Sequence, residues 1–232
     1  MKKITFLLLV FLIISCNERQ PDLIVKGEVK GLKKGTVYLK KVNDTVLVTV
    51  DSLVINGNPQ FELHSDLKSP EIFFLYLDKN SSDEDRITFF ADKGITEINT
   101  SLKSFVFDAK INGSAQQKIL EKYETMMSKM NNKKLDLIKE HFEAQKDNDT
   151  AKINTIEKEN ENLLKRRYLY TVNFAINNRD SEVAPYLALS KVYNARVKFL
   201  DTINNSLTPK VKKSKYGKEL QAFIDRIKAS NK

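Results

Sequence analysis

The chain has 232 residues, a formal net charge of +9 and 41% hydrophobic residues, which allows one large domain or two small ones. Its single cysteine excludes a disulfide framework, a Cys-x-x-Cys redox pair and a zinc site built from several thiolates, and it has no tryptophan. The basic excess is dispersed along the chain, apart from a lysine cluster at positions 210–218.

Residues 1–15 have the pattern of a lipoprotein signal peptide. Two lysines near the start precede an apolar run over 4–14, which is too short to cross a bilayer as a helix. The run ends in Ile-Ile-Ser-Cys, where a small residue precedes the cut and the thiol of Cys16 accepts the lipid. We therefore expect Cys16 to be the lipid-anchored N-terminus. The alternatives are a cleaved secretory signal that contains a cysteine, and a short N-terminal membrane anchor.

Residues 16–22 are polar and read as a tether between the anchor and the folded part. Position 17 is Asn rather than Asp, so the inner-membrane retention signal of some Gram-negative bacteria is absent. We expect a cell-envelope location, lipid-anchored to the outer membrane and facing the periplasm. In that compartment the basic surface indicates contact with anionic headgroups or glycans, and no nucleic-acid partner is expected.

Residues 23–112 predict a β domain. Short β-branched and aromatic runs recur about every ten residues, separated by turn residues such as Asn56-Gly57 and Lys93-Gly94. The run at 71–78 is apolar on both faces, so we expect it to be a central strand, and the last strand is predicted at 105–111. About eight strands at this spacing favour a small antiparallel β-sandwich or barrel.

Residues 113–232 predict a helical region, so the fold class is α+β. Ser114 is placed to cap a helix over 115–146, and a turn at 147–150 leads to a second helix ending near 177. Two helices of this length, each about 45 Å, joined by a short turn predict an antiparallel hairpin. The stretch 157–162 is polar all round, which predicts a thin, exposed arm near the turn.

The rest of the helical region is predicted to form shorter helices. We expect them at about 184–194, 195–204 and 214–229, with a break at Thr208-Pro209.

Several motifs, taken in order, resemble the domain of unknown function that stands at the N-terminus of many Gram-negative lipoprotein thiol–disulfide oxidoreductases of the thioredoxin-like type. They are Val25–Val29 with Gly35–Leu39, Asp51-Ser52 followed by Asn56-Gly57 and Phe61, Phe90–Gly94, Asn112–Ser114, Ser181–Tyr186 and Ser214–Lys218. The resemblance spans 23–229 and implies the fold and the envelope location. The spacing from Gly57 to Phe61 is longer than in that family.

The family's redox chemistry does not follow from this resemblance. In those proteins a thioredoxin-like domain with a Trp-Cys-x-x-Cys motif comes after the helices, whereas these 232 residues contain no tryptophan and one cysteine. The resemblance leaves one functional alternative, an accessory partner in trans of a separate thioredoxin-like thiol–disulfide oxidoreductase.

Candidate catalytic and metal-binding residues are few. His64 and His141 have no metal-ligand spacing, and the acidic run 83–85 lacks the spaced ligands and glycine of a calcium loop, so we expect neither a metal nor another cofactor. Asp51-Ser52 is interpreted as a structural pair whose short side chains bond nearby backbone groups. We expect no enzyme, and instead a non-catalytic binding or interaction module with an envelope protein as partner.

Two side chains are candidate O-glycosylation acceptors, since Asp-Ser/Thr-aliphatic (or Ala) triplets are acceptors in some envelope proteins. They are Thr150, in the predicted hairpin turn, and Ser52. The alternative is that such triplets arise by chance. The stripe of Met126, Met127 and Met130 is interpreted as core packing or a hairpin seam, with an adaptable partner groove as the alternative.

Overall fold

The computed structural model describes residues 20–78 and 85–230. The predicted signal peptide, Cys16 and most of the acidic run 83–85 lie outside the described residues. Within the described part, no helix combines the length and apolar character needed to span a membrane. Asp22, predicted to end the tether, contacts the β domain. It accepts a hydrogen bond from the Leu67 backbone nitrogen (3.1 Å) and forms an ion pair with the Lys93 ammonium group (2.8 Å).

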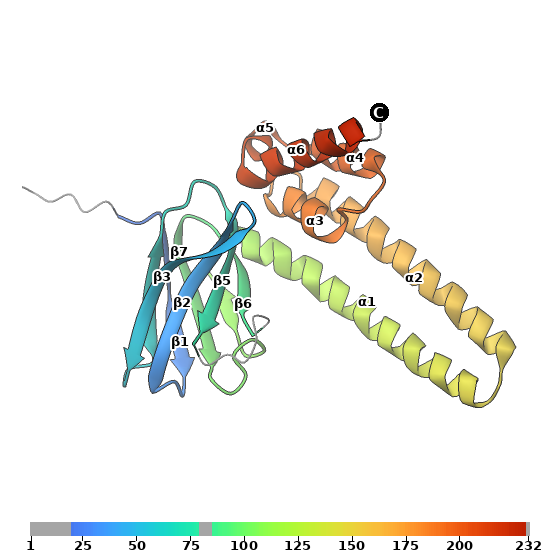
Figure 1. Cartoon of the computed structure of the whole chain (residues 1–232), viewed down its shortest axis with the longest axis horizontal. Helices are drawn as coiled ribbons and strands as arrows, with labels where there is room; N and C mark the ends of the chain where they lie inside the picture. Colours follow the sequence, from blue (N-terminus) through green and yellow to red (C-terminus); the bar gives the residue numbers. More distant parts are fainter. Residues whose placement is uncertain (1–19, 79–84, 231–232) are drawn as a thin grey trace, which may run out of the picture.

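Two four-stranded sheets lie face to face (Figure 1). One has the order β4-β1-β7-β8 and the other β3-β2-β5-β6. The strands are β1 (Leu23–Lys30), β2 (Lys34–Asn43), β3 (Val46–Asn56), β4 (Gln60–Ser65), β5 (Glu71–Leu77), β6 (Ile87–Ala91), β7 (Gly94–Ser101) and β8 (Lys110–Asn112). The predicted sandwich is confirmed, and the barrel alternative is wrong because the described strands form two separate sheets.

One strand pair departs from an antiparallel sandwich. β1 and β7 are parallel, with Leu23 opposite Gly94 and Lys30 opposite Ser101. Gly27 lies in this pair, and a Cβ atom there would come within 1.8 Å of the Ile98 carbonyl oxygen. Glycine is therefore the residue that lets the two backbones approach this closely.

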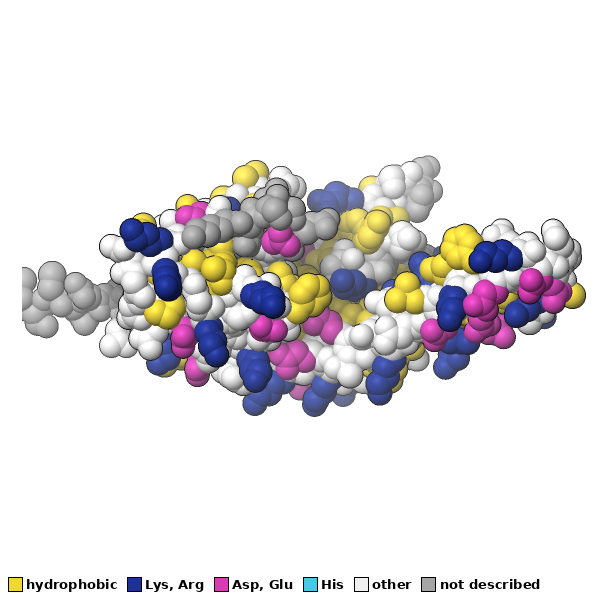
Figure 2. Space-filling model, turned by 90° about the horizontal axis from the view of Figure 1, so that it is seen from below, with side chains coloured by type: hydrophobic (Ala, Val, Ile, Leu, Met, Phe, Trp, Pro, Cys, Tyr) yellow, Lys and Arg dark blue, Asp and Glu magenta, His cyan; other side chains and the backbone are white. Residues whose placement is uncertain are grey.

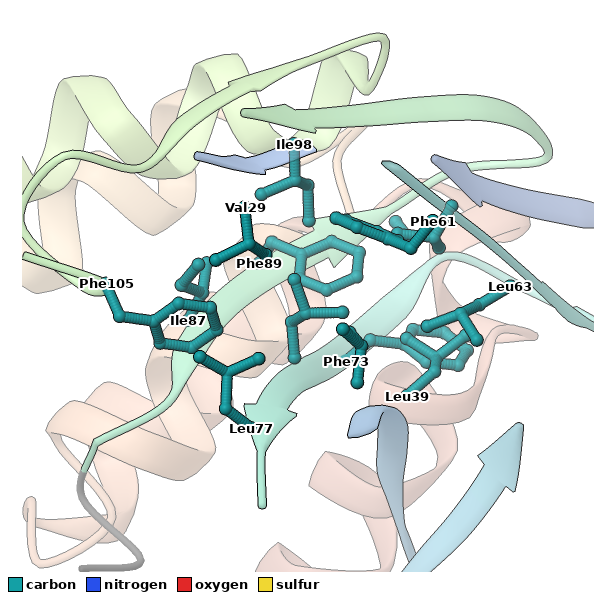
Figure 3. Close-up of a cluster of buried hydrophobic side chains, with 14 of the residues drawn as sticks. Val29, Leu39, Phe61, Leu63, Phe73, Leu77, Ile87, Phe89, Ile98 and Phe105 are labelled. Carbon is teal, nitrogen blue, oxygen red and sulfur yellow. The ribbon is translucent and has the colours of Figure 1, made fainter. Parts of the chain in front are cut away.

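The core between the sheets is aliphatic and aromatic (Figure 3). Phe73 of β5 and Phe89 of β6 are fully buried and stack at 6.1 Å between ring centroids. Every residue of β5 is buried: Phe73 and Leu75 face the sandwich core, while Phe74 and Tyr76 face the helices. The predicted central position of this strand is confirmed.

The strand predicted at 105–111 is mostly a turn. Only Lys110–Asn112 pairs with β7, and the Asp108 backbone nitrogen donates to the Ser104 carbonyl oxygen. Phe105 is buried in the sandwich core, whereas Val106 and Phe107 are both exposed. The apolar residues of this run have the composition of a strand, but only the first aromatic ring enters the core. The side chains therefore do not alternate between the core and solvent as they would in a strand.

The helical hairpin agrees with its prediction. α1 (Ala115–Lys146) starts at Ser114, whose hydroxyl oxygen accepts from the Gln117 backbone nitrogen at 3.0 Å. α2 (Thr150–Asn177) starts at Asp149, whose carboxylate accepts from the Lys152 backbone nitrogen at 2.9 Å. These caps supply partners for backbone groups that a helix end leaves free.

Four further helices share a hydrophobic core with the base of α2 (Figure 1). They are α3 (Val183–Lys191), α4 (Val197–Ser206), α5 (Pro209–Lys212) and α6 (Lys215–Ser230). The expected break at Thr208-Pro209 is confirmed, because α4 ends at Ser206 and Pro209 begins the separate helix α5, where proline is compatible with the first turn. Ala175, Leu200 and Ile224 are fully buried in the core that these helices share with α2.

Candidate interaction surface on the helical arm

The hairpin is held to the sandwich at its base. Gln117 of α1 accepts a hydrogen bond from the Phe90 backbone nitrogen at 2.8 Å, and Asp92 accepts from the Ser114 hydroxyl at 2.9 Å. Tyr123 of α1 bonds Thr171 of α2 at 2.9 Å in a buried contact. Since these groups are buried or partly buried, leaving any one unpaired would cost free energy, which fixes the direction of the hairpin.

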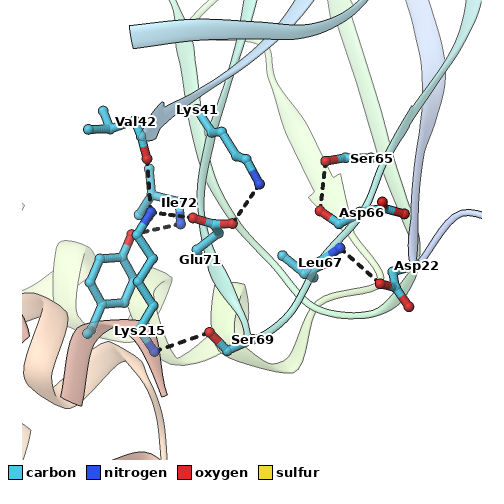
Figure 4. A network of polar contacts seen from close by, with 11 residues as sticks. Asp22, Lys41, Val42, Ser65, Asp66, Leu67, Ser69, Glu71, Ile72 and Lys215 are labelled. Atoms are coloured by element: carbon cyan, nitrogen blue, oxygen red, sulfur yellow. Dashed lines mark hydrogen bonds and ion pairs between the residues drawn. The ribbon is translucent and has the colours of Figure 1, made fainter. Parts of the chain in front are cut away.

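A buried carboxylate joins the sandwich to α6 (Figure 4). Glu71 of β5 is 6% exposed and binds the ammonium groups of Lys41 at 3.1 Å and Lys215 at 2.5 Å. Lys215 also donates to the Val42 carbonyl oxygen at 2.9 Å. A buried carboxylate needs such partners, so this cluster reads as a structural joint rather than as a reactive group.

Two titratable groups with shifted pKa values also belong to this packing. Burial raises the pKa of Tyr216, whose ring packs against both Phe90 and Tyr186. Burial likewise raises the pKa of Glu219, one turn further along α6. The cause is desolvation in the joint between the sheet and the helices.

Beyond its base the hairpin continues as an arm, defined here as residues 130–167 (Figure 1). The two helices of the arm share a thin internal seam. The seam contains Leu137 and Ala144 from α1 and Ile156 and Leu163 from α2, with Met130 and Ile153 partly buried at its ends. Each helix of the arm therefore places one fully packed side chain in the seam every seven residues. That leaves other apolar residues of the arm at the surface.

A groove follows one face of the arm. Its wider part has a volume of about 300 Å³ and is lined by Leu137, Ile138, His141, Phe142, Ile156, Glu157 and Asn160. Its narrower part, about 170 Å³, is lined by Lys134, Asn160, Glu161, Leu163, Leu164 and Arg167. Both parts share Asn160, and at 3.6 residues per turn their lining residues fall on one side of each helix. We call this surface the arm groove.

Large apolar side chains that line the arm groove stand open to solvent: Ile138 is 41%, Phe142 61% and Leu164 68% exposed. Leu135, on the same arm but outside the groove lining, is 63% exposed. Figure 2 shows apolar side chains at the surface of the arm, on the right, among basic and acidic ones. An apolar strip with a charged rim is typical of a surface that binds a helix.

Apolar spacing alone does not show which residues of α1 face α2. Leu135, Ile138 and Phe142 are apolar, but Leu137 and Ala144 occupy the seam. The seam follows a spacing of seven residues from Tyr123 through Met130, and a one-residue rotation decides which residues face inward. The polar stretch 157–162 is exposed, as expected.

The methionine stripe serves packing. Met127 packs against the cluster between the sheet and the helices, and Met130 against the arm seam, which agrees with its interpretation as core or seam. Met126 is half-buried.

The predicted single-residue sites do not converge. His64 lies on β4 beside Glu62 at 3.0 Å, and His141 lies in the arm groove 4.0 Å from Glu157. Across residues 20–78 and 85–230, no three acidic, histidine or cysteine side chains gather as a metal site would require. The pair Asp51-Ser52 has the structural role that we predicted, since Asp51 accepts from the His64 backbone nitrogen at 2.7 Å and ties β3 to β4.

Both candidate glycosylation acceptors lie at the surface. Thr150 is the first residue of α2, at the free end of the arm, and Ser52 lies on β3. Both are exposed, and their modification stays a prediction.

Comparison with known proteins gives one match. Residues 23–120 match the model of a family described as a domain of unknown function (DUF4369), which covers the sandwich and the start of α1. No curated protein and no solved structure matches the chain. The match supports a domain of unknown function over the sandwich and the start of α1, and the arm lies outside the matched segment.

Proposed function

We propose that this protein is a non-catalytic, lipid-anchored module of the cell envelope that binds a protein partner through the arm groove. The observation that carries the proposal is the exposure of Leu135, Ile138, Phe142 and Leu164 on a projecting arm whose base is held by buried contacts. Full burial of one such side chain contributes about 1.5 kcal/mol or more, so a partner that covers this strip gains affinity. A helix is the shape that fits a groove between two helices.

The envelope location belongs to the same proposal. The lysine-flanked apolar run and the box ending in Cys16 support acylation of that thiol, and Asn17 supports the outer membrane as the destination. The protein would then face the periplasm, where its basic surface meets anionic headgroups. Radiolabelled palmitate should enter the protein, and Cys16→Ala should abolish the label.

A binding role is also supported by the chemistry of the arm groove. Its polar groups are a lysine, an arginine, a histidine, an asparagine and two glutamates on the rim of an open apolar strip. Catalysis by general acids or nucleophiles works best where water is excluded and a base is held against a nucleophile. Rim groups of this kind instead fix the orientation of a bound helix.

A relationship to lipoproteins that carry a thioredoxin-like domain is also part of the proposal. The order of motifs over 23–229 supports kinship with the lipoproteins that carry a thioredoxin-like domain, and through it the alternative of a redox accessory acting in trans. An unchanged thiol redox state of envelope proteins after deletion of the gene would remove that alternative.

Site-specific photocrosslinking tests the binding proposal in intact cells. A photoreactive amino acid at Phe142, in the arm groove, should give a discrete protein adduct whose partner is identified by mass spectrometry. The same amino acid at Lys139, one turn earlier but outside the groove lining, is the matched control. Reciprocal capture of the partner should depend on an intact groove and fail with Ile138→Glu. Equal adducts from both positions, or none from either, would refute the proposed surface.

A further inference from the structure

We propose that the lysines of α5 and of the start of α6 are the surface with which this protein rests on the membrane, where they bind the phosphate groups of anionic lipids. We call this surface the basic end, and it consists of Lys210, Lys212, Lys213 and Lys218. The inference rests on the proposed function, because it takes Cys16 as the anchored residue. Two independent observations carry it: the place where the tether joins the sandwich, and the distribution of charge around that place.

The lysines of the basic end have no carboxylate partners. Between Asp201 and Glu219 the chain has five lysines and no acidic residue. One of the five, Lys215, is held by the buried carboxylate of Glu71. The other four are exposed, and in the described part of the chain none of them forms an ion pair. Four free ammonium groups within nine residues concentrate positive charge on one surface.

Acidic groups border the basic end but do not outnumber its positive charges. They are Asp44, Asp180, Glu182 and Glu219. Glu182, which lies near Lys210, is only 2% exposed, and burial raises the pKa of its carboxyl, so it adds little negative charge to the surface. The three exposed carboxylates stand against four lysines and Arg179, whose carbonyl oxygen accepts from the Thr208 backbone nitrogen beside α5 (3.1 Å). The surface therefore keeps an excess of positive charge.

The tether joins the sandwich beside the basic end (Figure 4). The Asp22 carboxylate accepts from the Leu67 backbone nitrogen at 3.1 Å, and the Ser69 hydroxyl accepts from the Lys215 backbone nitrogen at 3.2 Å. Leu67 and Ser69 are two residues, about 7 Å, apart. The start of α6 thus lies close to the point where the chain enters β1. In Figure 1 the first described residues and α5 both lie in the upper half of the view, whereas the free end of the arm lies at the lower right.

The length of the tether limits how far the membrane lies from this point. Asp22 is six residues after Cys16, so the anchored residue is at most about 20 Å from it. β1 then runs eight residues, about 26 Å, away from Asp22. A protein that stands on the end where β1 begins keeps Asp22 within the limit and turns the far end of β1 away from the membrane. Since several faces around Asp22 meet the limit, charge selects among them.

The outer face of the sheet that contains β1 has the opposite charge. Across β4, β1 and β7 the charged residues that line its shallow groove are Lys26, Glu28, Glu62 and Glu97. Three carboxylates against one ammonium group are repelled by anionic headgroups, whereas the basic end is attracted to them. The membrane therefore meets the basic end rather than this sheet face.

This orientation leaves the arm groove free for a protein partner. α1 has 32 residues and is about 48 Å long, and its far end lies away from the residues that follow the tether (Figure 1). A partner in the arm groove is then held clear of the headgroups. The basic end and the arm groove can be occupied at the same time.

Fluorescence quenching in reconstituted vesicles tests the orientation with the full, acylated chain. A fluorophore on Asn205→Cys, whose carbonyl oxygen accepts from Lys212 of α5 at 3.5 Å, should be quenched by lipids with a spin label on their headgroup. The same fluorophore on Asn154→Cys, at an exposed asparagine near the free end of the arm, is the matched control. In vesicles of phosphatidylglycerol and phosphatidylcholine we expect at least about threefold stronger quenching at 205 than at 154.

Charge variants test whether the lysines cause this contact. The first variant carries Lys212→Gln, Lys213→Gln and Lys218→Gln. The matched control removes the same charge from exposed positions of α2 and carries Lys152→Gln, Lys158→Gln and Lys165→Gln. Quenching at 205 should fall at least about twofold in the first variant, in about 0.5 M salt and in vesicles of phosphatidylcholine alone, because each condition removes or screens the attraction. The control variant should behave as the native chain.

The outcomes separate this inference from the proposed function. Quenching at 205 that needs phosphatidylglycerol and the three lysines supports the membrane-facing basic end. Equal quenching at 205 and 154, or quenching at 205 that survives the loss of the lysines, overturns it and leaves the arm groove untouched. Lysine-dependent sedimentation with an anionic glycan, without quenching by the lipid, assigns the basic end to a glycan and also overturns it. If palmitate does not enter the native chain, the anchor and this inference fail together, and photocrosslinking at Phe142 still decides the arm groove.

Discussion

The phenol oxygen of Tyr216, in the first turn of α6, accepts a hydrogen bond from the backbone nitrogen of Ile72 in β5 at 3.0 Å. The pairing of β2 with β5 ends at Phe73, so the amide of Ile72 has no strand partner on that side and the tyrosine supplies one. A residue 144 positions away thus completes the sheet, and it ties the last helix to the sandwich.

Tyr216→Phe should lower the free energy of unfolding by about 1–3 kcal/mol, because the buried amide of Ile72 loses its acceptor. Denaturant unfolding followed by circular dichroism measures the change. Tyr193→Phe, at an exposed tyrosine, is the control and should have little effect. Equal stability of the two variants would contradict a structural role for the bond.

Alkaline pH should destabilise the native protein more than the Tyr216→Phe variant. Burial raises the pKa of Tyr216 above the ordinary 10.0, so the folded state holds the proton that the unfolded state releases. The stability from this group is complete below pH 10 and is lost as the pH rises toward the folded-state pKa. Unfolding series at several pH values from 8 to 11 should show the steeper loss in the native chain, and parallel curves would count against this account.

Glu71→Gln should weaken the joint between β5 and α6. The carboxylate is buried and faces two ammonium groups, and a neutral amide would leave Lys41 and Lys215 without their counter-charge. We expect a loss of up to about 3 kcal/mol, measured by chemical unfolding. Glu62→Gln, at an exposed carboxylate, is the control. Two indistinguishable unfolding curves would show that the cluster adds no stability.

Gly27→Ala should disrupt the parallel pairing of β1 with β7. The new Cβ atom would stand 1.8 Å from the Ile98 carbonyl oxygen, so one backbone must move. We expect a loss of about 3 kcal/mol and reduced yield of folded protein, measured by thermal unfolding. Lys26→Ala, next to it on the same strand, should fold normally. A fully stable Gly27→Ala protein would be incompatible with the described register.

Thr150→Ala should remove a glycan if the turn of the arm is modified. Thr150 is exposed at the free end of the hairpin, which makes its hydroxyl accessible to a transferase. Intact-mass spectrometry of the protein from its natural host should show the loss of one glycan mass, and Ser52→Ala tests the second acceptor in the same way. Identical masses for the native chain and both variants would refute these two sites.

Local sequence determined much of this protein. The limits of α1 and α2 follow from the Ser114 and Asp149 caps and from helical periodicity, and the turn glycines mark most strand ends. The central position of β5 could be predicted from the sequence because both of its faces are apolar. Such features depend on residues that are close in the chain, so they can be predicted from the sequence pattern.

The tertiary structure alone decided the features that depend on distant partners. The parallel pairing of β1 with β7 arises because the chain visits the second sheet between them. The sequence does not show that Phe105 is buried and Phe107 exposed, because this depends on where the sandwich core ends in the folded protein. Leu137 faces the arm seam and Ile138 faces solvent because the rotation of α1 is set at its base, by contacts with β6 and α2. Since adjacent helix residues point about 100° apart, that rotation separates the packed seam from the exposed groove.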